Sequence, residues 1–416
     1  MRQRRCNFGV VYFNITMKKV FIAAALLLGV ARAQSGRYFD PVFAALDSTK
    51  DVVYGRAALW SGDTIDLHLD VFEPSGDTET LRPLVVFIHG GGFLEGTKAN
   101  EEVVQFCRSL ARRGYVTASI QYRLGVDLDS IGGDVGERQI VRAAVRATHD
   151  AKAAVRFFRA RAGEWRIDPD KIYLGGSSAG GVTAMHTAYM NSEAKFLEVA
   201  PRWLWDEMGG LEGASGTPGV SSAVQGAINL NGTLTRSGWV ETATPLLNVA
   251  ATADSQVPFV RGYAGLPGVA ALAVDGPYLL DSAARAEGVW TRFLVFPGAG
   301  HVPYITPGPN RAAYQDTTDR FLRDGLYTWT TGQSVSRIRP RSAQIRVFPT
   351  RFADGFNVES VGPVSVALYD AAGKNVFSES APEGGFFRPR LGTGVYFLTV
   401  RTENDYFSGP VFVDKE

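Results

Sequence analysis

Cysteine is nearly absent: the chain has only two, Cys6 and Cys107. Cys6 belongs to an N-terminal segment that, as argued below, we expect to be removed on export. One remaining cysteine cannot form an intramolecular disulfide, so the hydrophobic core has to supply the stability. Cys107 lies in the helical pattern VVQFCRSLA, which favours a buried structural thiol over a reactive one.

A dominant charge of either sign is also absent. The 43 basic residues nearly balance the 42 acidic residues, which gives a formal net charge of +1. Nothing in this balance indicates a nucleic acid partner, an anionic surface or a disordered acidic tail. Apolar residues make up 45% of the chain and charged residues 20%, which is typical of globular proteins with a sizeable core.

A long hydrophobic run is missing as well. The N-terminal run VFIAAALLLGV has 11 residues, whereas a membrane-spanning helix needs about 20. It follows the basic start MKK and precedes ARAQ, a pattern typical of an export signal cleaved after Ala33. No cysteine stands at the cleavage point, so we expect no lipid anchor. Residues 1–33 are therefore predicted to be an N-terminal extension and signal peptide, with Met17 as the expected true start.

The remaining chain divides into two parts of different character. Residues 34–331 alternate apolar, β-rich runs with helical stretches, which predicts a mostly parallel sheet with helices on both faces. Residues 332–343 are polar without periodicity and are predicted to be a linker. Residues 344–416 contain short strands separated by turns, which predicts a small all-β sandwich. The runs interpreted as strands of the sheet are LVVFIH, YVTASIQY, KIYLGG, AVQGAINL, PLLNVAAT and RFLVFPG, preceded by two antiparallel edge strands that turn at Ser61–Asp63.

The segment GSSAG, centred on Ser178, matches the G-x-S-x-G nucleophile elbow. A predicted strand precedes it and an alanine-rich helix follows, as that motif requires. Gly176 and Gly180 would leave room where strand and helix approach each other. Another glycine-rich turn of an α/β fold is the alternative, although no phosphate-binding pattern is present.

The segment HGGGF, residues 89–93, follows the strand LVVFI and suggests a second part of the same site. Hydrolysis through a tetrahedral intermediate needs N–H donors aimed at the oxyanion. We expect Gly91 and Gly92, together with Ala179 at the start of the elbow helix, to supply them. His89 is expected to support this loop rather than to act in catalysis.

The acid and base of a triad should follow the serine in the order acid, then histidine. Of the two histidines after Ser178, His186 lies on the elbow helix, which leaves His301. Asp254 follows the strand PLLNVAAT and is the predicted acid. Two competitors, Asp275 and Asp281, do not directly follow a strong strand. Ser178 would attack, His301 would transfer the proton, and Asp254 would fix the imidazole.

Together, HGGGF, QYRLG, RIDPDKIYLGGSSAGG, ADSQVPF and GAGHVPY resemble α/β-hydrolase-fold carboxylesterases of the hormone-sensitive-lipase and feruloyl-esterase-like type. The resemblance covers residues from about 50 to 330. It implies an α/β-hydrolase fold with an eight-stranded sheet and a cap over the cleft, and it implies no metal and no cofactor.

Residues 344–416 resemble a type IX secretion sorting domain of the kind found in Bacteroidetes, through VALYDAAGKNVF and GTGVYFLTV. VFPTRF stands where the family has a YPNP-like signature, and Thr350 departs from it. The resemblance implies export across the outer membrane and an interaction with the secretion machinery. The alternative is a carbohydrate-binding or adhesive sandwich, which the lack of tryptophan in this segment disfavours.

Residues 191–222 are predicted to form a cap insertion in which Trp203 and Trp205 line the substrate pocket, with Trp239 as a further wall. The alternative is a surface subdomain that packs its tryptophans onto the body. The predicted function is a secreted serine carboxylesterase for small acyl or aryl esters, with feruloyl and acetyl esters of plant polysaccharide as candidates. A serine peptidase on the same fold and a non-catalytic binding protein are the alternatives.

Overall fold

The computed structural model describes residues 36–59, 61–125, 134–240, 244–266, 270–333, 345–348, 350–360, 362–370, 374–402 and 406–414. The predicted signal peptide, the start at Met17 and all but the first two residues of the predicted linker lie outside the described residues.

An eight-stranded sheet forms the centre of the larger part of the molecule, in the order β1-β2-β4-β3-β5-β6-β7-β10. From β4 to β10 all neighbours are parallel, whereas β1 pairs with β2, and β2 with β4, in antiparallel fashion. The predicted edge hairpin and its turn are confirmed, since β1 ends at Ala58 and β2 begins at Thr64. The strands are β1 (Leu46–Ala58), β2 (Thr64–Pro74), β3 (Arg82–Ile88), β4 (Val116–Ile120), β5 (Ile167–Ser177), β6 (Gly226–Leu230), β7 (Leu246–Ala251) and β10 (Thr291–Phe296).

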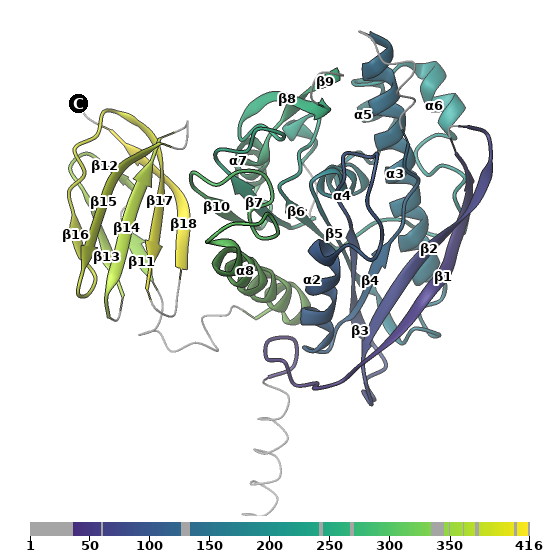
Figure 1. Ribbon diagram of the computed structural model, residues 1–416, viewed down its shortest axis with the longest axis horizontal. Helices are drawn as coiled ribbons and strands as arrows, with labels where there is room; N and C mark the ends of the chain where they lie inside the picture. The colour runs from purple at the N-terminus through teal and green to yellow at the C-terminus, as the bar shows by residue number, and fades with distance from the viewer. Residues whose placement is uncertain are drawn as a thin grey trace, which may run out of the picture.

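Helices cover both faces of this sheet (Figure 1). Strand β3 shows why: Leu84, Val86 and Ile88 belong to the apolar cluster on the face that α4 covers, while Val85 and Phe87 belong to the cluster on the face that α2 covers. Successive side chains of a strand point to opposite faces, so a continuous apolar run fits only a sheet buried on both sides. The helices are α2 (Glu101–Ala111), α3 (Asp134–Ala160), α4 (Ala179–Tyr189), α7 (Pro277–Ala286) and α8 (Arg311–Thr331). This arrangement is the predicted α/β-hydrolase fold.

Shorter elements lie over the carboxyl ends of the parallel strands. They are α5 (Glu193–Leu197), α6 (Arg202–Met208), the 3-10 turn Ser237–Trp239, and the hairpin of β8 (Arg261–Leu266) and β9 (Ala270–Asp275). The hairpin was not expected from the sequence, because β8 (RGYAGL) is interrupted by glycines and β9 (AALAVD) consists largely of alanine, which has a low β-propensity.

The C-terminal residues form a separate β-sandwich with its own apolar core. Its sheets have the orders β11-β13-β16 and β12-β18-β17-β14-β15. The prediction of a small all-β unit agrees with this structure, although β12, β15 and β16 were not anticipated. The strands are β11 (Arg346–Phe348), β12 (Arg351–Phe352), β13 (Phe356–Glu359), β14 (Val364–Tyr369), β15 (Asn375–Ala381), β16 (Gly385–Phe387), β17 (Gly394–Arg401) and β18 (Tyr406–Val413).

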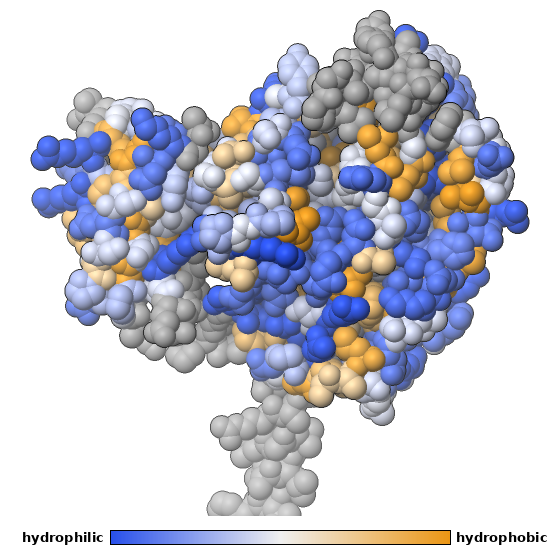
Figure 2. Space-filling model, viewed as in Figure 1, coloured by the Kyte–Doolittle hydropathy of each residue, from blue (hydrophilic) through white to orange (hydrophobic). Residues whose placement is uncertain are grey.

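The sandwich rests against the β10 edge of the large sheet (Figure 1). Phe397 from β17 is 2% exposed and meets the ring of Phe259 edge-on at 4.9 Å, beside Phe293 and Val295 of β10. Figure 2 shows the two parts as distinct lobes, with hydrophobic residues in scattered patches among hydrophilic ones on this face. The contact buries aromatic side chains on the outer face of the sandwich that would otherwise be exposed to water.

Within the described ranges, no helix combines the length and apolarity needed to cross a membrane.

Cys107 is buried on α2, and burial raises the pKa of its thiol to about 12, so it is a structural residue as predicted.

Candidate active site

Ser178 occupies the sharp turn between β5 and α4, with φ 54° and ψ −119°. A non-glycine residue rarely adopts a positive φ, and such strain is typical of functional sites. Its neighbours have to be small: a Cβ at Gly176 would lie 2.2 Å from the carbonyl of Gly180, and one at Gly180 would lie 2.1 Å from the carbonyl oxygen of Ile88. The role predicted for these two glycines is therefore confirmed.

The structure brings Ser178, His301 and Asp254 together from three distant parts of the chain. His301 Nε2 lies 2.7 Å from Ser178 Oγ, and His301 Nδ1 lies 2.7 Å from Asp254 Oδ2. A carboxylate only accepts, so Nδ1 carries a proton and donates a hydrogen bond to Asp254, which leaves Nε2 free to accept one from the serine hydroxyl. This is the hydrogen-bond chain that activates a serine nucleophile.

Asp254 is held by more than the histidine. Its Oδ1 accepts from the backbone N–H groups of Gln256 and Val257, each at 2.9 Å, and its Oδ2 accepts from the side-chain amide of Asn231 at 3.2 Å. The side chain of Asp254 is 3% exposed. These hydrogen bonds fix the orientation of the carboxylate, so the imidazole meets a preset partner.

Asn231 was not predicted as a site residue. It directly follows β6 and has a φ of 54°. Its position at the end of a predicted strand was the sequence feature that could have identified it as a site residue. Four neighbouring strands, β5, β6, β7 and β10, thus supply Ser178, Asn231, Asp254 and His301 at their carboxyl ends. Ligands of open α/β sheets bind at this edge.

Asp275 and Asp281, the competing candidates for the triad acid, form ion pairs and hydrogen bonds elsewhere. Asp275 is paired with Arg261 at 2.6 Å and accepts from Ser237. Asp281 is paired with Arg285 at 2.7 Å and accepts from Thr291 at 2.8 Å. Neither is bonded to a histidine, so the geometry favours Asp254 as the acid.

His89 supports the HGGGF loop, as expected. Its ring stacks on Tyr122 with centroids 4.5 Å apart, and its Nδ1 donates to the carbonyl of Gly90 at 2.7 Å. Burial lowers the pKa of His89 to about 4, so the ring is neutral at neutral pH and fits a supporting role.

Two of the three predicted oxyanion donors, Gly92 and Ala179, line a cavity together with Ser178. Within the described part of the chain, no acceptor is bonded to the N–H of either residue. Ala179 is also the first residue of α4, where the helix dipole favours negative charge. The third, Gly91, is not among the lining residues. It has φ 104° and closes a turn in which its carbonyl accepts from Leu94 and Glu95.

Glu102, in the first turn of α2, is a second residue that sequence reasoning missed. Its carboxylate accepts from the backbone N–H of Gly90, in the middle of the HGGGF loop. Burial raises the pKa of Glu102, while the hydrogen bonds from Gly90 and Asn100 and the nearby His301 lower it. The sequence signal for Glu102 was an acidic residue in the first turn of the helix that follows the loop. We infer that Glu102 fixes the loop beside Ser178.

Replacing Glu102 with alanine is expected to lower kcat about 10-fold to 100-fold, because small displacements of a donor loop cost that much in transition-state stabilisation. KM should change less, since the loop acts mainly on the oxyanion. The matched control is Glu101→Ala at the exposed neighbouring position, which should leave kcat within about twofold. Equal steady-state kinetics for the two variants would show that Glu102 is not needed to position the loop.

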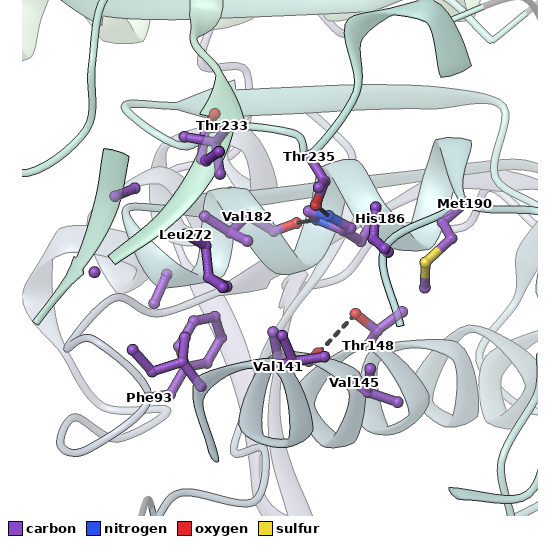
Figure 3. Close-up of a pocket in the computed structure, with 18 of the residues that line it drawn as sticks. Phe93, Val141, Val145, Thr148, Val182, His186, Met190, Thr233, Thr235 and Leu272 are labelled. Atoms are coloured by element: carbon purple, nitrogen blue, oxygen red, sulfur yellow. Dashed lines mark hydrogen bonds between the residues drawn. The ribbon is translucent and has the colours of Figure 1, made fainter. Parts of the chain in front are cut away.

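The cavity beside Ser178 has a volume of about 330 Å³ and a mostly apolar wall. Figure 3 shows Val141 and Val145 of α3, Val182 of α4 and Met190, which directly follows α4, pointing into it. Phe93 of the HGGGF loop also borders it. An apolar wall with a few polar groups is typical of a small-molecule site.

None of the three tryptophans predicted as pocket walls is among the residues that line this cavity, although Trp203 borders an adjoining pocket. Trp203 is 44% exposed and lies over the guanidinium of Arg142, and Trp205 packs against Phe196. Trp239 is buried behind the cavity wall and donates to Glu198 at 3.0 Å. The short helix α6 turns Leu204 inward, which leaves Trp203 on the outer side.

The predicted cap, residues 191–222, contributes to the cavity in another way. Phe196, Val199 and Ala200 line it, whereas the later residues are tied to α3. Lys152 donates to the carbonyl of Leu211 at 3.0 Å, and Arg156 donates to that of Gly216 at 2.9 Å. This packing fits the alternative of a subdomain that packs onto the body.

No cluster of three or more histidine, cysteine, aspartate or glutamate side chains that could hold a metal occurs within the described ranges.

Comparison with known proteins places both motifs in one matched segment. Residues 69–207 match the family model BD-FAE, and this segment contains HGGGF and the nucleophile elbow. It makes up about a third of the chain, and it ends before Asp254 and His301.

Two curated relatives and one solved structure are similar to parts of the chain. The non-reducing polyketide synthase atr1 of Stereocaulon alpinum is 32% identical over 128 residues, which are 30% of this chain and 5% of that protein. The probable isoprenylcysteine alpha-carbonyl methylesterase ICME of Oryza sativa subsp. japonica is 29% identical over 172 residues, 41% of this chain and 35% of that protein. The chain thus spans well under half the length of each relative. Thermogutta terrifontis esterase 2, phosphorylated by paraoxon, is 23% identical with a TM-score of 0.47, covering 68% of this chain and 94% of that one.

Proposed function

We propose that this protein is a serine carboxylesterase that hydrolyses carboxylic esters through an acyl-enzyme intermediate. The observation that carries the proposal is the hydrogen-bond chain from Ser178 through His301 to Asp254, at 2.7 Å for both links. This hydrogen-bond chain borders an apolar cavity whose wall includes the backbone N–H groups of Gly92 and Ala179, for which the described residues provide no acceptor. The match of residues 69–207 to BD-FAE and the similarity to a methylesterase support the same class.

The roles follow from the geometry. Ser178 Oγ attacks the ester carbonyl as His301 Nε2 takes its proton, and the N–H groups of Gly92 and Ala179 stabilise the oxyanion. Removing one such donor typically costs about 3 kcal/mol of transition-state stabilisation. The histidine then gives its proton to the leaving alcohol, and water releases the acyl group by the same steps in reverse order. Asp254 holds the imidazole in the required tautomer throughout.

The ester class is proposed as small acyl or aryl esters, with feruloyl and acetyl esters of plant polysaccharide as candidates. A cavity of about 330 Å³ is at the lower end of the range for small-molecule sites, which favours small acyl or aryl groups over long acyl chains. A complete triad argues against a non-catalytic binding protein, which would be free to lose any of the three side chains.

The test is a panel of p-nitrophenyl esters of rising acyl length, methyl ferulate, acetylated xylan and a peptide p-nitroanilide, each with wild type and Ser178→Ala. We expect ester hydrolysis that depends on Ser178 and declines for long acyl chains. Cleavage of the anilide at a higher kcat/KM than the esters would identify a peptidase. Absence of turnover with every substrate of the panel would favour a non-catalytic binding protein.

We further propose that the chain is exported and that its C-terminal sandwich directs it to a type IX secretion system. The signal-like N-terminus and the sorting-domain resemblance support this. Expression in a bacterium that has this system, with the full chain and a chain ending at Thr331, is the test. The full chain should reach the cell surface or the medium, and the short chain should stay in the periplasm. An equal distribution would contradict the proposal.

A further inference from the structure

The cavity beside Ser178 contains a short polar chain on its otherwise apolar wall. His186, on the face of α4 that borders the cavity, has its Nδ1 2.8 Å from the carbonyl oxygen of Val182 and its Nε2 2.8 Å from the hydroxyl of Thr235. Figure 3 shows the imidazole of His186 in contact with the carbonyl of Val182 on one side and the hydroxyl of Thr235 on another. The triad does not use this chain, so its effect falls on whatever occupies the cavity.

The direction of each hydrogen bond in this chain is fixed by chemistry. A carbonyl oxygen only accepts, so Nδ1 of His186 carries the proton. Burial lowers the pKa of His186 to about 4, so at neutral pH the ring is neutral and Nε2 holds a lone pair. The hydroxyl proton of Thr235 must therefore point at Nε2. Thr235 has no proton left for a ligand, and its oxygen can only accept.

Two other threonines on the wall are in the same state. The hydroxyl of Thr148 donates to the carbonyl of Ala144 at 2.8 Å, and that of Thr233 donates to the carbonyl of Asp275 at 2.6 Å. Each of the three threonine hydroxyls on the cavity wall thus donates its proton to an acceptor within the protein. Towards a ligand, each oxygen can therefore act only as an acceptor. Apart from Ser178 and His186, the other polar side chains of the lining are Glu198, Arg236 and Gln256, and all three are exposed.

The cavity lies on the acyl side of the nucleophile. Ser178, Gly92 and Ala179 line it, whereas His301 does not. The leaving alcohol has to face His301 to receive its proton, so the group on the other side of the ester carbonyl enters the cavity. The acceptor oxygens therefore face the acyl group.

We propose that the acyl pocket selects acyl groups that carry a hydroxyl, which donates a hydrogen bond to Thr235. This inference rests on the proposed esterase function and specifies its substrate class. A hydroxylated acyl group gains the bond, an unsubstituted one leaves an acceptor unused, and a methyl ether places a lone pair against the lone pairs of Thr235. The expected order of kcat/KM is hydroxyl, then unsubstituted, then methyl ether.

The test uses p-nitrophenyl phenylacetate, its ring-hydroxylated positional isomers and their methyl ethers. With wild type, at least one hydroxyl isomer should exceed its ether in kcat/KM about tenfold or more, the value of one neutral hydrogen bond and the avoided repulsion. In Thr235→Val that ratio should fall to about one, because the acceptor is lost. Thr235→Ser keeps the hydroxyl and the bond to His186, so it should keep the preference.

The matched control is Thr317→Val. Thr317 also donates to a helix carbonyl, that of Ala313 at 2.7 Å, but it lies on the exposed side of α8. In Thr317→Val, the ratio of kcat/KM for the hydroxyl isomer to kcat/KM for its methyl ether should equal that of wild type. A wild type that turns over these esters without preferring any hydroxyl isomer, or a preference that survives in Thr235→Val, overturns the inference and leaves the esterase proposal intact. Absence of turnover for every ester, including p-nitrophenyl butyrate, removes both.

Discussion

Replacing Ser178 with alanine is expected to lower kcat for p-nitrophenyl butyrate at least about ten-thousandfold, with the fold retained. The hydroxyl is the group that forms the covalent bond, and no other nucleophile is bonded to His301 Nε2 among the described residues. Where a serine, a histidine and an acid act as one unit, removing the serine removes nearly all of the covalent catalysis. Steady-state kinetics with circular dichroism of both proteins provide the measurement.

The neighbouring Ser177 offers a matched control. Its hydroxyl is buried and bonded to that of Tyr304 at 2.9 Å, so it plays no part in the nucleophile's hydrogen-bond chain. Ser177→Ala should lose less than about tenfold in kcat, together with some stability. A Ser178→Ala protein that keeps more than a few per cent of wild-type kcat would show that another residue attacks the ester.

Replacing Asp254 with asparagine is the second large effect, with kcat expected to fall about a thousandfold to ten-thousandfold. The amide keeps the size of the side chain but can donate to His301 Nδ1. The imidazole would then carry its proton on Nε2, facing Ser178, and could not accept the serine proton. Asn231 and the backbone donors of Gln256 and Val257 would also lose a charged acceptor.

Asp281→Asn is the control for this substitution, since Asp281 is another buried acid that follows Ser178 in the chain. It pairs with Arg285 and Thr291 away from the triad, so the variant should lose stability and keep kcat within a few-fold. Thermal unfolding and initial rates separate the two effects. A larger loss of kcat in Asp281→Asn than in Asp254→Asn would contradict the assignment of the acid.

The large sheet could be predicted from the sequence because each buried strand leaves a local signature. LVVFIH and KIYLGG are apolar on both faces, which only a sheet covered on both sides requires. The expected order of serine, acid and histidine along the chain, and the position of each directly after a strand, then restricted the triad to a few candidates. The elbow needed one more signal, the run of glycines, whose space the structure shows to be filled by the backbone of Ile88 and Gly180.

The pocket could not be predicted in the same way, because it depends on which face of each surface element turns inward. Trp203 and Leu204 are neighbours in the sequence, and only the packing of α6 decides that Leu204 is buried and Trp203 exposed. Asn231 and Glu102 act through contacts to residues more than ten positions away, which no local pattern encodes. The state of Thr235 depends on the tautomer of His186, which only the position of the Val182 carbonyl reveals.

The most direct test of the central claim is the site at which a fluorophosphonate probe reacts. An activated serine attacks the phosphorus and expels fluoride, whereas an ordinary serine hydroxyl does not. The folded protein should carry one probe per chain, located by peptide mass spectrometry on Ser178, and the heat-unfolded protein should carry none. A folded chain that stays unlabelled, or one labelled at a different residue, would contradict the proposed triad.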